Sequence, residues 1–460
     1  MTLNVLIDRV TEAMAEGSAA RGGPVPAGSP AELEARVRRV LGDVLPERGT
    51  GAEEAATALA WLLAYGGPDP ADPRCAAHLH CPPLPEAVAT DLAVSMLNPS
   101  LDSWDQAPSA VTMEKALVAA LATLVGYGEH ASGTVTTGGS ESNLMGLLLA
   151  RDRRPAASRR RLVFCSRAAH FSVRRAAALL GLGEDAVIPV PTDASHRMHA
   201  GALAAALSDA AAMGEIPVAV VATAGTTDTG AIDPLHEIAA LCASHGAWLH
   251  VDAAHGGGAL FSSRLAPLLD GLGRADSVAI DLHKFGWVPA AAGVFLVKEA
   301  GALRSLEMSA AYLNPGDDVA EGYDGLLGVS LRTTRRPDCA KILVVLRSLG
   351  RSGLGALVER CHTLANRAAD LVEASPELEL VVRPVLSTVV FRYRAPDGDL
   401  VNAGLRRRLL AEGRAVVGRT ELDGRVCLKL TVLNPEADVA AVLAAVIDAG
   451  RVLAGTKETR

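Results

Sequence analysis

The stretches HVDAAHGGG (250–258) and SVAIDLHKFG (277–286) decide the fold. Each contains a short β-prone run, and the runs end in polar groups at Asp252 and at His283-Lys284. Similar apolar runs recur along the chain between Ala- and Leu-rich helical segments, at 161–166, 218–223 and 293–297. Nearly continuous apolarity indicates strands that are covered on both faces. Alternation of such strands with helices predicts an α/β domain with a mainly parallel sheet.

The sequence on either side of this core has other patterns. Residues 1–16 are typical of an amphipathic helix, and the Gly/Pro/Ser-rich residues 17–30 are typical of a flexible link. Ser29, Pro30 and Glu32 predict the capped start of the next helix. We expect a helical N-terminal segment, a large α/β domain and a small C-terminal α+β domain, at 1–100, 101–350 and 351–460.

Composition limits the classes of function. The 460 residues carry a net charge of −8, which argues against nucleic acid as a partner. The Arg-rich stretch 151–161 is the exception, and we interpret it as a solvated linker. No stretch reads as long and apolar enough to cross a bilayer, and the acidic N-terminal residues are unlike a signal peptide, so we expect a cytoplasmic protein without membrane partners.

The cysteine and histidine pattern disfavours disulfides and metal sites. Seven cysteines are present and none forms a CxxC pair. His78, His80 and Cys81 lie close together, but no second ligand group follows at metal spacing. We therefore predict no bound metal.

Asp252 and Lys284 suggest a specific cofactor. Residues at the carboxyl ends of parallel strands meet in one crevice, so an acid and an amine from separate strands can face one ligand. A desolvated lysine can hold an aldehyde as an imine. A carboxylate can keep a pyridine nitrogen protonated, so that the ring accepts electrons. This pair is what pyridoxal 5'-phosphate (PLP) requires.

Three further segments supply candidate ligands for that cofactor. The turn Gly138-Gly139-Ser140 precedes a helix, and a glycine-rich turn at a helix N-terminus suits a phosphate. Thr226 and Thr227 follow a buried strand and can bond to a ligand or simply cap the turn. His170 follows another strand, where an imidazole can stack on a flat ring or serve only as a polar residue.

Taken together, the segments TTGGSESN, AAHFSVRRAA, ATAGTTDTGAID, HVDAAHGGG and DLHKFG resemble the group II PLP decarboxylases. This family includes glutamate, aromatic amino acid and diaminobutyrate decarboxylases. The resemblance extends from about residue 75 to 440. It implies an aspartate-aminotransferase-like fold (PLP fold type I) and a homodimer with its active site at the subunit interface.

The resemblance also implies roles for individual residues. Lys284 would carry PLP, Asp252 would pair with the ring nitrogen, and His170 would stack on the ring. Gly139 and Ser140 would bind the phosphate, and Thr227 and Ala254 would line the ring pocket. His283 would support the cofactor beside the lysine.

A lid is the last feature that the resemblance implies. Residues 312–336 match a mobile loop that enters the neighbouring subunit's site, and Tyr323 is its best match to a proton donor. A solvated aromatic side chain is the other interpretation of Tyr323. Arg336 is expected to have a structural or carboxylate-contacting role.

The substrate class is read from shorter stretches. HLHCPPLP, LNPSLDSWDQAP and SLRTTRRPD resemble diaminobutyrate decarboxylases and related lysine and ornithine decarboxylases. We therefore expect decarboxylation of a basic or polar aliphatic amino acid. Aromatic substrates, oxidative aldehyde formation on the same fold, and a catalytically silent PLP-binding protein are the alternatives.

Overall fold

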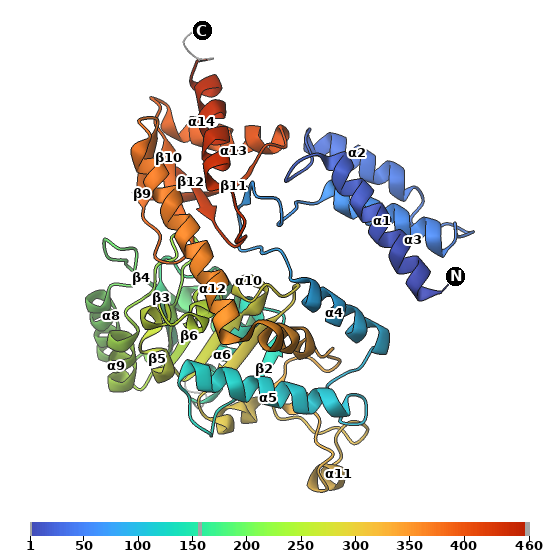
Figure 1. The fold of residues 1–460 in the computed structure, drawn as a ribbon. Helices are drawn as coiled ribbons and strands as arrows, with labels where there is room; N and C mark the ends of the chain where they lie inside the picture. Colours follow the sequence, from blue (N-terminus) through green and yellow to red (C-terminus); the bar gives the residue numbers. More distant parts are fainter. Residues whose placement is uncertain (1, 155–158, 456–460) are drawn as a thin grey trace. The chain divides into compact units, whose positions relative to one another are not determined.

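The structure is a computed structural model that describes residues 2–154 and 159–455 (Figure 1). The chain divides into two compact units. One combines Met1–Pro82 with Cys361–Arg460, and the other is Pro83–Arg360. The sequence placed boundaries at residues 100 and 350 and expected three parts, whereas the compact units meet at 82/83 and 360/361.

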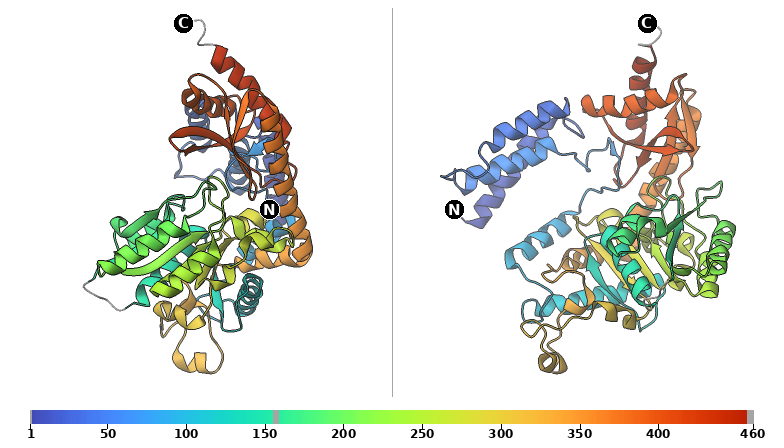
Figure 2. Two further views of the ribbon diagram at one scale, coloured as in Figure 1. Left: turned by 90° about the vertical axis from the view of Figure 1, so that its left-hand side faces the viewer. Right: turned by 180° about the vertical axis from the view of Figure 1, so that it is seen from behind.

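The unit Pro83–Arg360 is built on a seven-stranded sheet with the order β2-β8-β7-β6-β5-β3-β4 (Figures 1 and 2). The strands are β2 Ser132–Thr136, β3 Arg161–Ser166, β4 Val187–Val190, β5 Ile216–Thr223, β6 Trp248–Asp252, β7 Ser277–Asp281 and β8 Gly293–Val297. Only β8 runs against its neighbours among these seven strands. All residues of β6, β7 and β8 are buried, so both faces of the sheet are covered there. The predicted mainly parallel α/β domain is confirmed.

The described part of the same unit also contains eight α-helices before residue 339. They are α4 Pro85–Leu97, α5 Pro108–Val125, α6 Gly139–Asp152, α7 Ser172–Leu179, α8 Ala200–Ala212, α9 Leu235–His245, the one-turn α10 Leu282–Phe285 and α11 Gly316–Ala320. Helix α6 packs against β5 to β8, and α9 packs against β5 and β6. The long α12, Cys339–Ala374, changes direction at Gly350, whose φ of 64° only glycine adopts readily. The part of α12 beyond this break continues to Ala374.

Helix α5 corrects one expectation. By length and composition alone, α5 could cross a membrane, and it is the one such helix among the described residues. The sequence had led us to expect none. It also carries Glu114, which is buried and ion-paired with Arg335, and it packs against β2 and β8. This arrangement is that of a core helix.

The second unit joins three N-terminal helices to a C-terminal α+β layer. The helices are α1 Leu3–Arg21, α2 Pro30–Leu41, α3 Ala52–Gly66, α13 Gly398–Ala411 and α14 Val439–Gly455. The sheet order is β1-β11-β12-β10-β9, with β1 Cys75–Ala76, β9 Leu378–Val382, β10 Thr388–Tyr393, β11 Val416–Leu422 and β12 Arg425–Thr431.

Two N-terminal expectations had different outcomes. The capping box at Ser29 and Glu32 is present as predicted. The flexible link was placed too early, because α1 continues through residues 17–21. Gly17 is buried in this helix beside α3, where a Cβ would lie 2.4 Å from the carbonyl oxygen of Trp61. Gly17 therefore serves helix packing, and the helix ends at Gly22.

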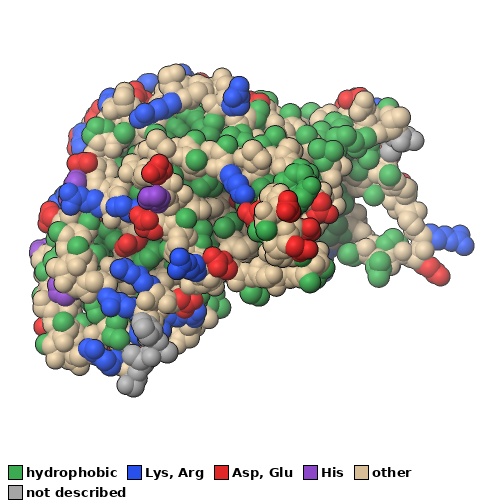
Figure 3. Space-filling model, turned by 90° about the horizontal axis from the view of Figure 1, so that it is seen from below, with side chains coloured by type: hydrophobic (Ala, Val, Ile, Leu, Met, Phe, Trp, Pro, Cys, Tyr) green, Lys and Arg blue, Asp and Glu red, His purple; other side chains and the backbone are tan. Residues whose placement is uncertain are grey.

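The Arg-rich stretch forms contacts within its own unit. Arg160 pairs with Asp185 and Glu215 at 3.1 and 3.3 Å, and Arg151 pairs with Asp152 at 2.6 Å. On the face drawn in Figure 3, basic and acidic side chains are interspersed. Residues 155–158 of this stretch lie outside the described residues.

Candidate active site

The ends of β6 and β7 bring the predicted residues to one edge of the sheet. These strands are parallel, and Asp252 at the end of β6 lies beside Ala279 of β7. Two residues after Ala279, β7 ends at Asp281, and the single turn of α10 then presents His283 and Lys284. Strand β2 runs in the same direction as β7 and leads into the glycine turn before α6.

The amine of Lys284 lies against a buried acid. Its Nζ is 2.9 Å from Oδ2 of Asp281, and the side chains are 16% and 3% exposed. Nε2 of His283 is 3.5 Å from the same oxygen, and burial lowers the pKa of His283. The other oxygen of Asp281 is buried and has no hydrogen-bond partner among the described residues. Sequence reasoning missed Asp281, although an acid at a strand's carboxyl end, three residues before the lysine, was a usable signal.

The glycine turn packs directly on this cluster. A Cβ at Gly138 would lie 3.0 Å from the His283 ring, and a Cβ at Gly139 would lie 2.9 Å from that of Ala254 and 3.4 Å from Asp281 Oδ2. Within the described chain, no side chain caps the first turn of α6, and Ser140 is exposed. Gly138 donates its backbone N–H to Oγ1 of Thr136 at 3.3 Å, so the N–H groups of Gly139 and Ser140 are the ones available to an anion such as a phosphate.

Asp252 is held by two hydrogen bonds. Its Oδ2 accepts from Nδ2 of Asn143 at 2.8 Å, and its Oδ1 accepts from the backbone N–H of Ala254 at 3.1 Å. Asp252 is 6% exposed and Asn143 is 1% exposed. Sequence reasoning also missed Asn143, although it lies in the quoted segment TTGGSESN.

The imidazole of His170 is subject to three charged groups of the predicted site. Burial lowers the pKa of its imidazole, and Asp252, Lys284 and Asp281 all act on it through space, the acids raising the pKa and the lysine lowering it. A single ring is thus within electrostatic reach of the amine and of both carboxylates. The sequence predicts an acid and an amine around one site, and Asp252 and Lys284 both act on the pKa of this one imidazole.

Three other predicted residues, Thr227, Tyr323 and Arg336, have no contact with Lys284 or Asp281 among the bonds described above. Thr227 is partly exposed in the turn after β5, while Thr226 is buried and bonds to Thr229 at 2.8 Å. Tyr323 is 51% exposed, and its ring packs edge-on against Trp104 with centroids 5.0 Å apart. Arg336 pairs with Asp91 at 2.7 Å near the surface.

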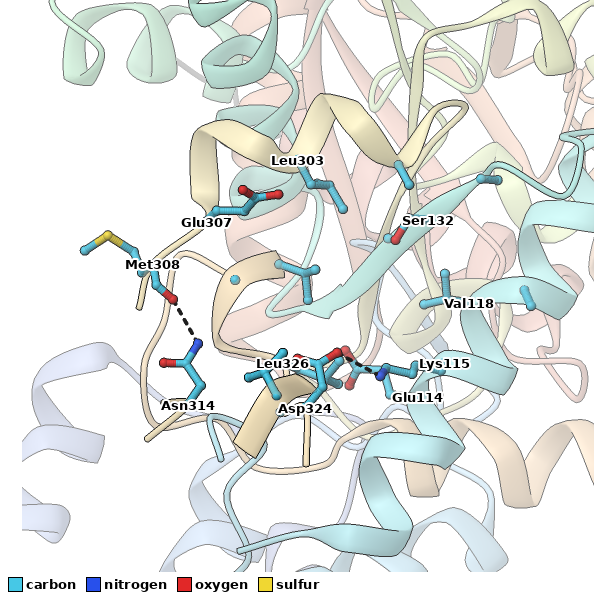
Figure 4. Close-up of a pocket in the computed structure, with 18 of the residues that line it drawn as sticks. Glu114, Lys115, Val118, Ser132, Leu303, Glu307, Met308, Asn314, Asp324 and Leu326 are labelled. Atoms are coloured by element: carbon cyan, nitrogen blue, oxygen red, sulfur yellow. Dashed lines mark hydrogen bonds and ion pairs between the residues drawn. The ribbon is translucent and has the colours of Figure 1, made fainter. Parts of the chain in front are cut away.

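A cavity of about 750 Å³ lies elsewhere in the same unit (Figure 4). Residues of α5, β2 and the 300–329 region line it, and they are a different set from the predicted site residues. Its contacts include the ion pair between Lys115 and Asp324 at 3.2 Å and the bond from Asn314 to the Met308 carbonyl at 2.9 Å. The segment that carries Tyr323 is thus tied to α5 in this chain.

Comparison with known proteins identifies the family of the chain. The family model described as "Pyridoxal-dependent decarboxylase conserved domain" matches residues 38–394. The chain belongs to the pyridoxal-dependent decarboxylase family. An L-2,4-diaminobutyrate decarboxylase from Rhizobium meliloti (strain 1021) is 46% identical over 405 residues, covering 85% of this chain and 80% of that protein. One from Acinetobacter baumannii is 36% identical, covering 79% and 76%.

Solved structures agree with this assignment. The glutamate decarboxylase domain of diaminobutyrate-pyruvate transaminase and L-2,4-diaminobutyrate decarboxylase from Vibrio parahaemolyticus has a TM-score of 0.86 at 32% identity, covering 97% of this chain and 95% of that one. Oryza sativa TDC, solved with PLP and tryptamine, has a TM-score of 0.88 at 25% identity, covering 98% and 97%. This pyridoxal-dependent decarboxylase therefore has the PLP fold type I and is an amino acid decarboxylase that uses PLP.

The residues present fit that cofactor. A partly accessible amine, a buried carboxylate and an uncapped helix N-terminus behind a glycine turn correspond to its aldehyde, its pyridine nitrogen and its phosphate. The unpartnered oxygen of Asp281 lies beside the glycine turn and can accept a hydrogen bond there.

Proposed function

We propose that this enzyme decarboxylates L-2,4-diaminobutyrate, or a closely similar basic aliphatic amino acid. The 46% identity to a diaminobutyrate decarboxylase over most of both chains supports this substrate class. The 2.9 Å contact between the amine of Lys284 and Asp281, directly beside the glycine turn before α6, is the observation that carries the chemistry.

The proposed roles follow from the contacts of each side chain. The amine of Lys284 would hold the cofactor by its aldehyde carbon. Bound PLP supplies a ring that accepts the electrons of the Cα–carboxylate bond as CO2 leaves. The carboxylate of Asp252 holds the proton on the ring nitrogen, and its two hydrogen bonds keep it oriented.

The remaining residues bind and shield. The N–H groups at Gly139 and Ser140 hold the phosphate, with His283 beside them. His170 covers one face of the ring, and Thr227 and Ala254 line its pocket. We assign to the Tyr323 hydroxyl the return of a proton to Cα, in the site of a neighbouring subunit.

We also infer that the enzyme works as a homodimer in the cytoplasm. The family resemblance of the 312–336 loop supports a shared site. The exposure of Tyr323, together with its packing on Trp104, is consistent with a loop that serves another subunit.

A substrate panel tests this proposal. The enzyme with PLP is incubated with L-2,4-diaminobutyrate, ornithine, lysine, glutamate and tryptophan, and CO2, amine, oxygen and peroxide are measured. We expect 1,3-diaminopropane and CO2 from diaminobutyrate in equal amounts, without oxygen uptake. Lys284→Ala serves as the control and should lose turnover together with the visible absorbance of bound PLP. Faster turnover of tryptophan, or peroxide release, would overturn the substrate or the reaction.

A further inference from the structure

We propose that Asn143 is a positioning residue whose single side-chain amide sets both the orientation of the charged Asp252 carboxylate and the tautomer of His170. The inference rests on the proposed roles of Asp252 and His170 toward PLP. It concerns a residue of α6 that contacts neither the lysine nor the glycine turn in the hydrogen bonds described above.

The direction of each hydrogen bond can be derived from chemistry. A carboxylate only accepts, so the group of Asn143 that lies 2.8 Å from Asp252 must be its NH2. The amide oxygen of Asn143 then faces Nε2 of His250 at 2.9 Å. Because an amide oxygen only accepts, Nε2 of His250 must carry a hydrogen.

The bonds behind His250 continue in the same direction. Its Nδ1 is 2.8 Å from Oγ of Ser277, which in turn accepts from the indole N–H of Trp248 at 2.9 Å. His250 is fully buried, and burial lowers its pKa to about 4, so the ring is neutral and Nδ1 accepts from Ser277. Every donor from Trp248 onward therefore points toward Asp252, a polarity that favours a charged acceptor.

A branch of the network reaches His170. The Asn143 NH2 group also donates to Oγ of Ser172 at 2.9 Å. Oγ of Ser172 is 2.8 Å from Nδ1 of His170, and the backbone N–H of Ser172 donates to the same nitrogen at 3.3 Å. Nδ1 of His170 is therefore an acceptor, and the ring carries its proton on Nε2.

Burial gives this amide its importance. Asn143, Ser172 and His250 are 1%, 2% and 0% exposed, so water does not replace a lost partner easily. Asn143 also lies in the first turns of α6, the helix whose N-terminus faces the phosphate site. A shift of this one side chain would disturb the ring-nitrogen acid and the stacking histidine together.

Two substitutions at Asn143 test the proposal. Asn143→Leu keeps the approximate volume and removes every bond, and Asn143→Asp keeps the shape but places a second carboxylate against Asp252. We expect each to raise the PLP dissociation constant of the apoenzyme at least about tenfold, because a buried charge loses its hydrogen-bond donor. We expect kcat to fall while the KM for the amino acid stays nearly constant.

Ser172→Ala separates the two branches of the network. It removes the hydroxyl at 2.8 Å from Nδ1 of His170 but keeps the backbone N–H donor at 3.3 Å. It should therefore shift the His170 ring nitrogen NMR signals in the apoenzyme toward a mixture of tautomers, while PLP affinity changes less than it does in the Asn143 variants. Asn402→Leu is the matched control, since Asn402 is fully buried and bonded to Tyr393 and Gly398 in the other compact unit. It should lower the melting temperature without changing PLP affinity.

The outcomes distinguish this inference from the proposed function. If folded Asn143 variants keep the wild-type PLP affinity, or if Ser172→Ala keeps the wild-type His170 tautomer, the positioning role is wrong. Asp252→Asn is measured in parallel. If it also leaves PLP affinity and turnover intact, the proposed role of Asp252 fails instead.

Discussion

Gly146 of α6 lies where the helix meets the buried ring of His250. A Cβ at this position would lie 2.6 Å from Nδ1 of His250 and 2.8 Å from Cγ. We predict that Gly146→Ala destabilises the protein by about 1–3 kcal/mol, the usual cost of overpacking a core, despite the better helix propensity of alanine. Urea unfolding followed by circular dichroism measures the change.

Gly404 of α13 provides the matched control for this substitution. It is also inside a helix, but the nearest atom to its added Cβ is Cδ1 of Leu453 at 3.4 Å. Gly404→Ala should therefore leave stability unchanged or raise it by up to about 1 kcal/mol. Equal effects at both positions would show that the His250 ring does not constrain α6.

The buried state of His250 predicts a pH dependence of stability. Its folded pKa lies below the ordinary value of 6.5, at about 4. The unfolded chain therefore binds the proton first, and the stabilisation present above pH 6.5 is lost as the pH falls toward 4. We predict that the wild type loses on the order of 3 kcal/mol more than His250→Gln over this range.

Urea unfolding of the apoenzyme at a series of pH values tests the His250 prediction. Asp233 has the opposite sign, because burial raises its pKa to about 6 and its contribution is lost as the pH rises from about 4 to 6. It is present in both proteins, so the difference between them isolates His250. Parallel curves for the two proteins would contradict the assignment.

Residues with a chemical signature could be predicted from sequence, and residues defined only by contacts could not. Lys284, Asp252 and the glycine turn could be recognised because their residue types suit a cofactor and because they lie at the ends of predicted strands. Asn143 does not, because its partner Asp252 is 109 positions away and an asparagine in a helix carries no special signal. Asp281 was overlooked because the nearby His283 and Lys284 already accounted for the polar residues expected at the end of this strand.

At the scale of elements, α5, β2 and the segment before α12 are joined by one buried ion pair. Nη1 of Arg335 lies 2.6 and 2.7 Å from the two carboxylate oxygens of Glu114, and the side chains are 1% and 2% exposed. Glu114 also accepts from Thr134 and from the backbone of Val135. We predict that Arg335→Leu costs about 3–5 kcal/mol, because it leaves an uncompensated buried charge.

The adjacent arginine is the control for the buried pair. Arg336 is about two-fifths exposed where it pairs with Asp91, so Arg336→Leu should cost no more than about 1 kcal/mol. The double variant Glu114→Leu/Arg335→Leu should recover part of the loss, since it removes both charges. Equal losses of unfolding free energy in Arg335→Leu and Arg336→Leu would show that the burial of the Glu114–Arg335 pair does not set its cost.

Elements with continuous apolarity were the most predictable. The runs at 161–166 and 277–281 match β3 and β7 residue for residue. The two-residue strand β1 and the strand β11 were not anticipated. Strand β1 is too short to show a period, and β11 becomes polar after Gly418, with Arg419 and Glu421 exposed. Helix α1 was cut short at Gly17 because the contact that favours glycine there is tertiary.

At the scale of the whole molecule, the shared site of the proposed dimer predicts complementation. Lys284→Ala and Tyr323→Phe homodimers should each form little amine. If Tyr323 acts in its neighbour's site, a hybrid dimer holds one intact site, and a random mixture should regain about a quarter of wild-type amine formation. Amine release after unfolding and refolding the two variants together measures this. No recovery would place Tyr323 in its own subunit's site, and a fully active Tyr323→Phe homodimer would place it outside the mechanism.

The two compact units explain why domain boundaries were hard to read. One unit is assembled from both ends of the chain, and a linear scan of composition cannot detect that residues before 83 and after 360 belong together. The second boundary, at residues 360 and 361, falls inside α12, where no turn residue signals it in the sequence.

The pairing of β1 with β11 has a consequence for biosynthesis. Cys75 pairs with Val416, and the backbone N–H of Asp438 bonds to the carbonyl of Pro73. At a translation rate of about 5–20 residues per second, the ribosome needs on the order of half a minute to make the partner strand after β1 emerges. During that interval β1 has no partner strand, so we expect it to stay unpaired until the ribosome has made the residues of β11.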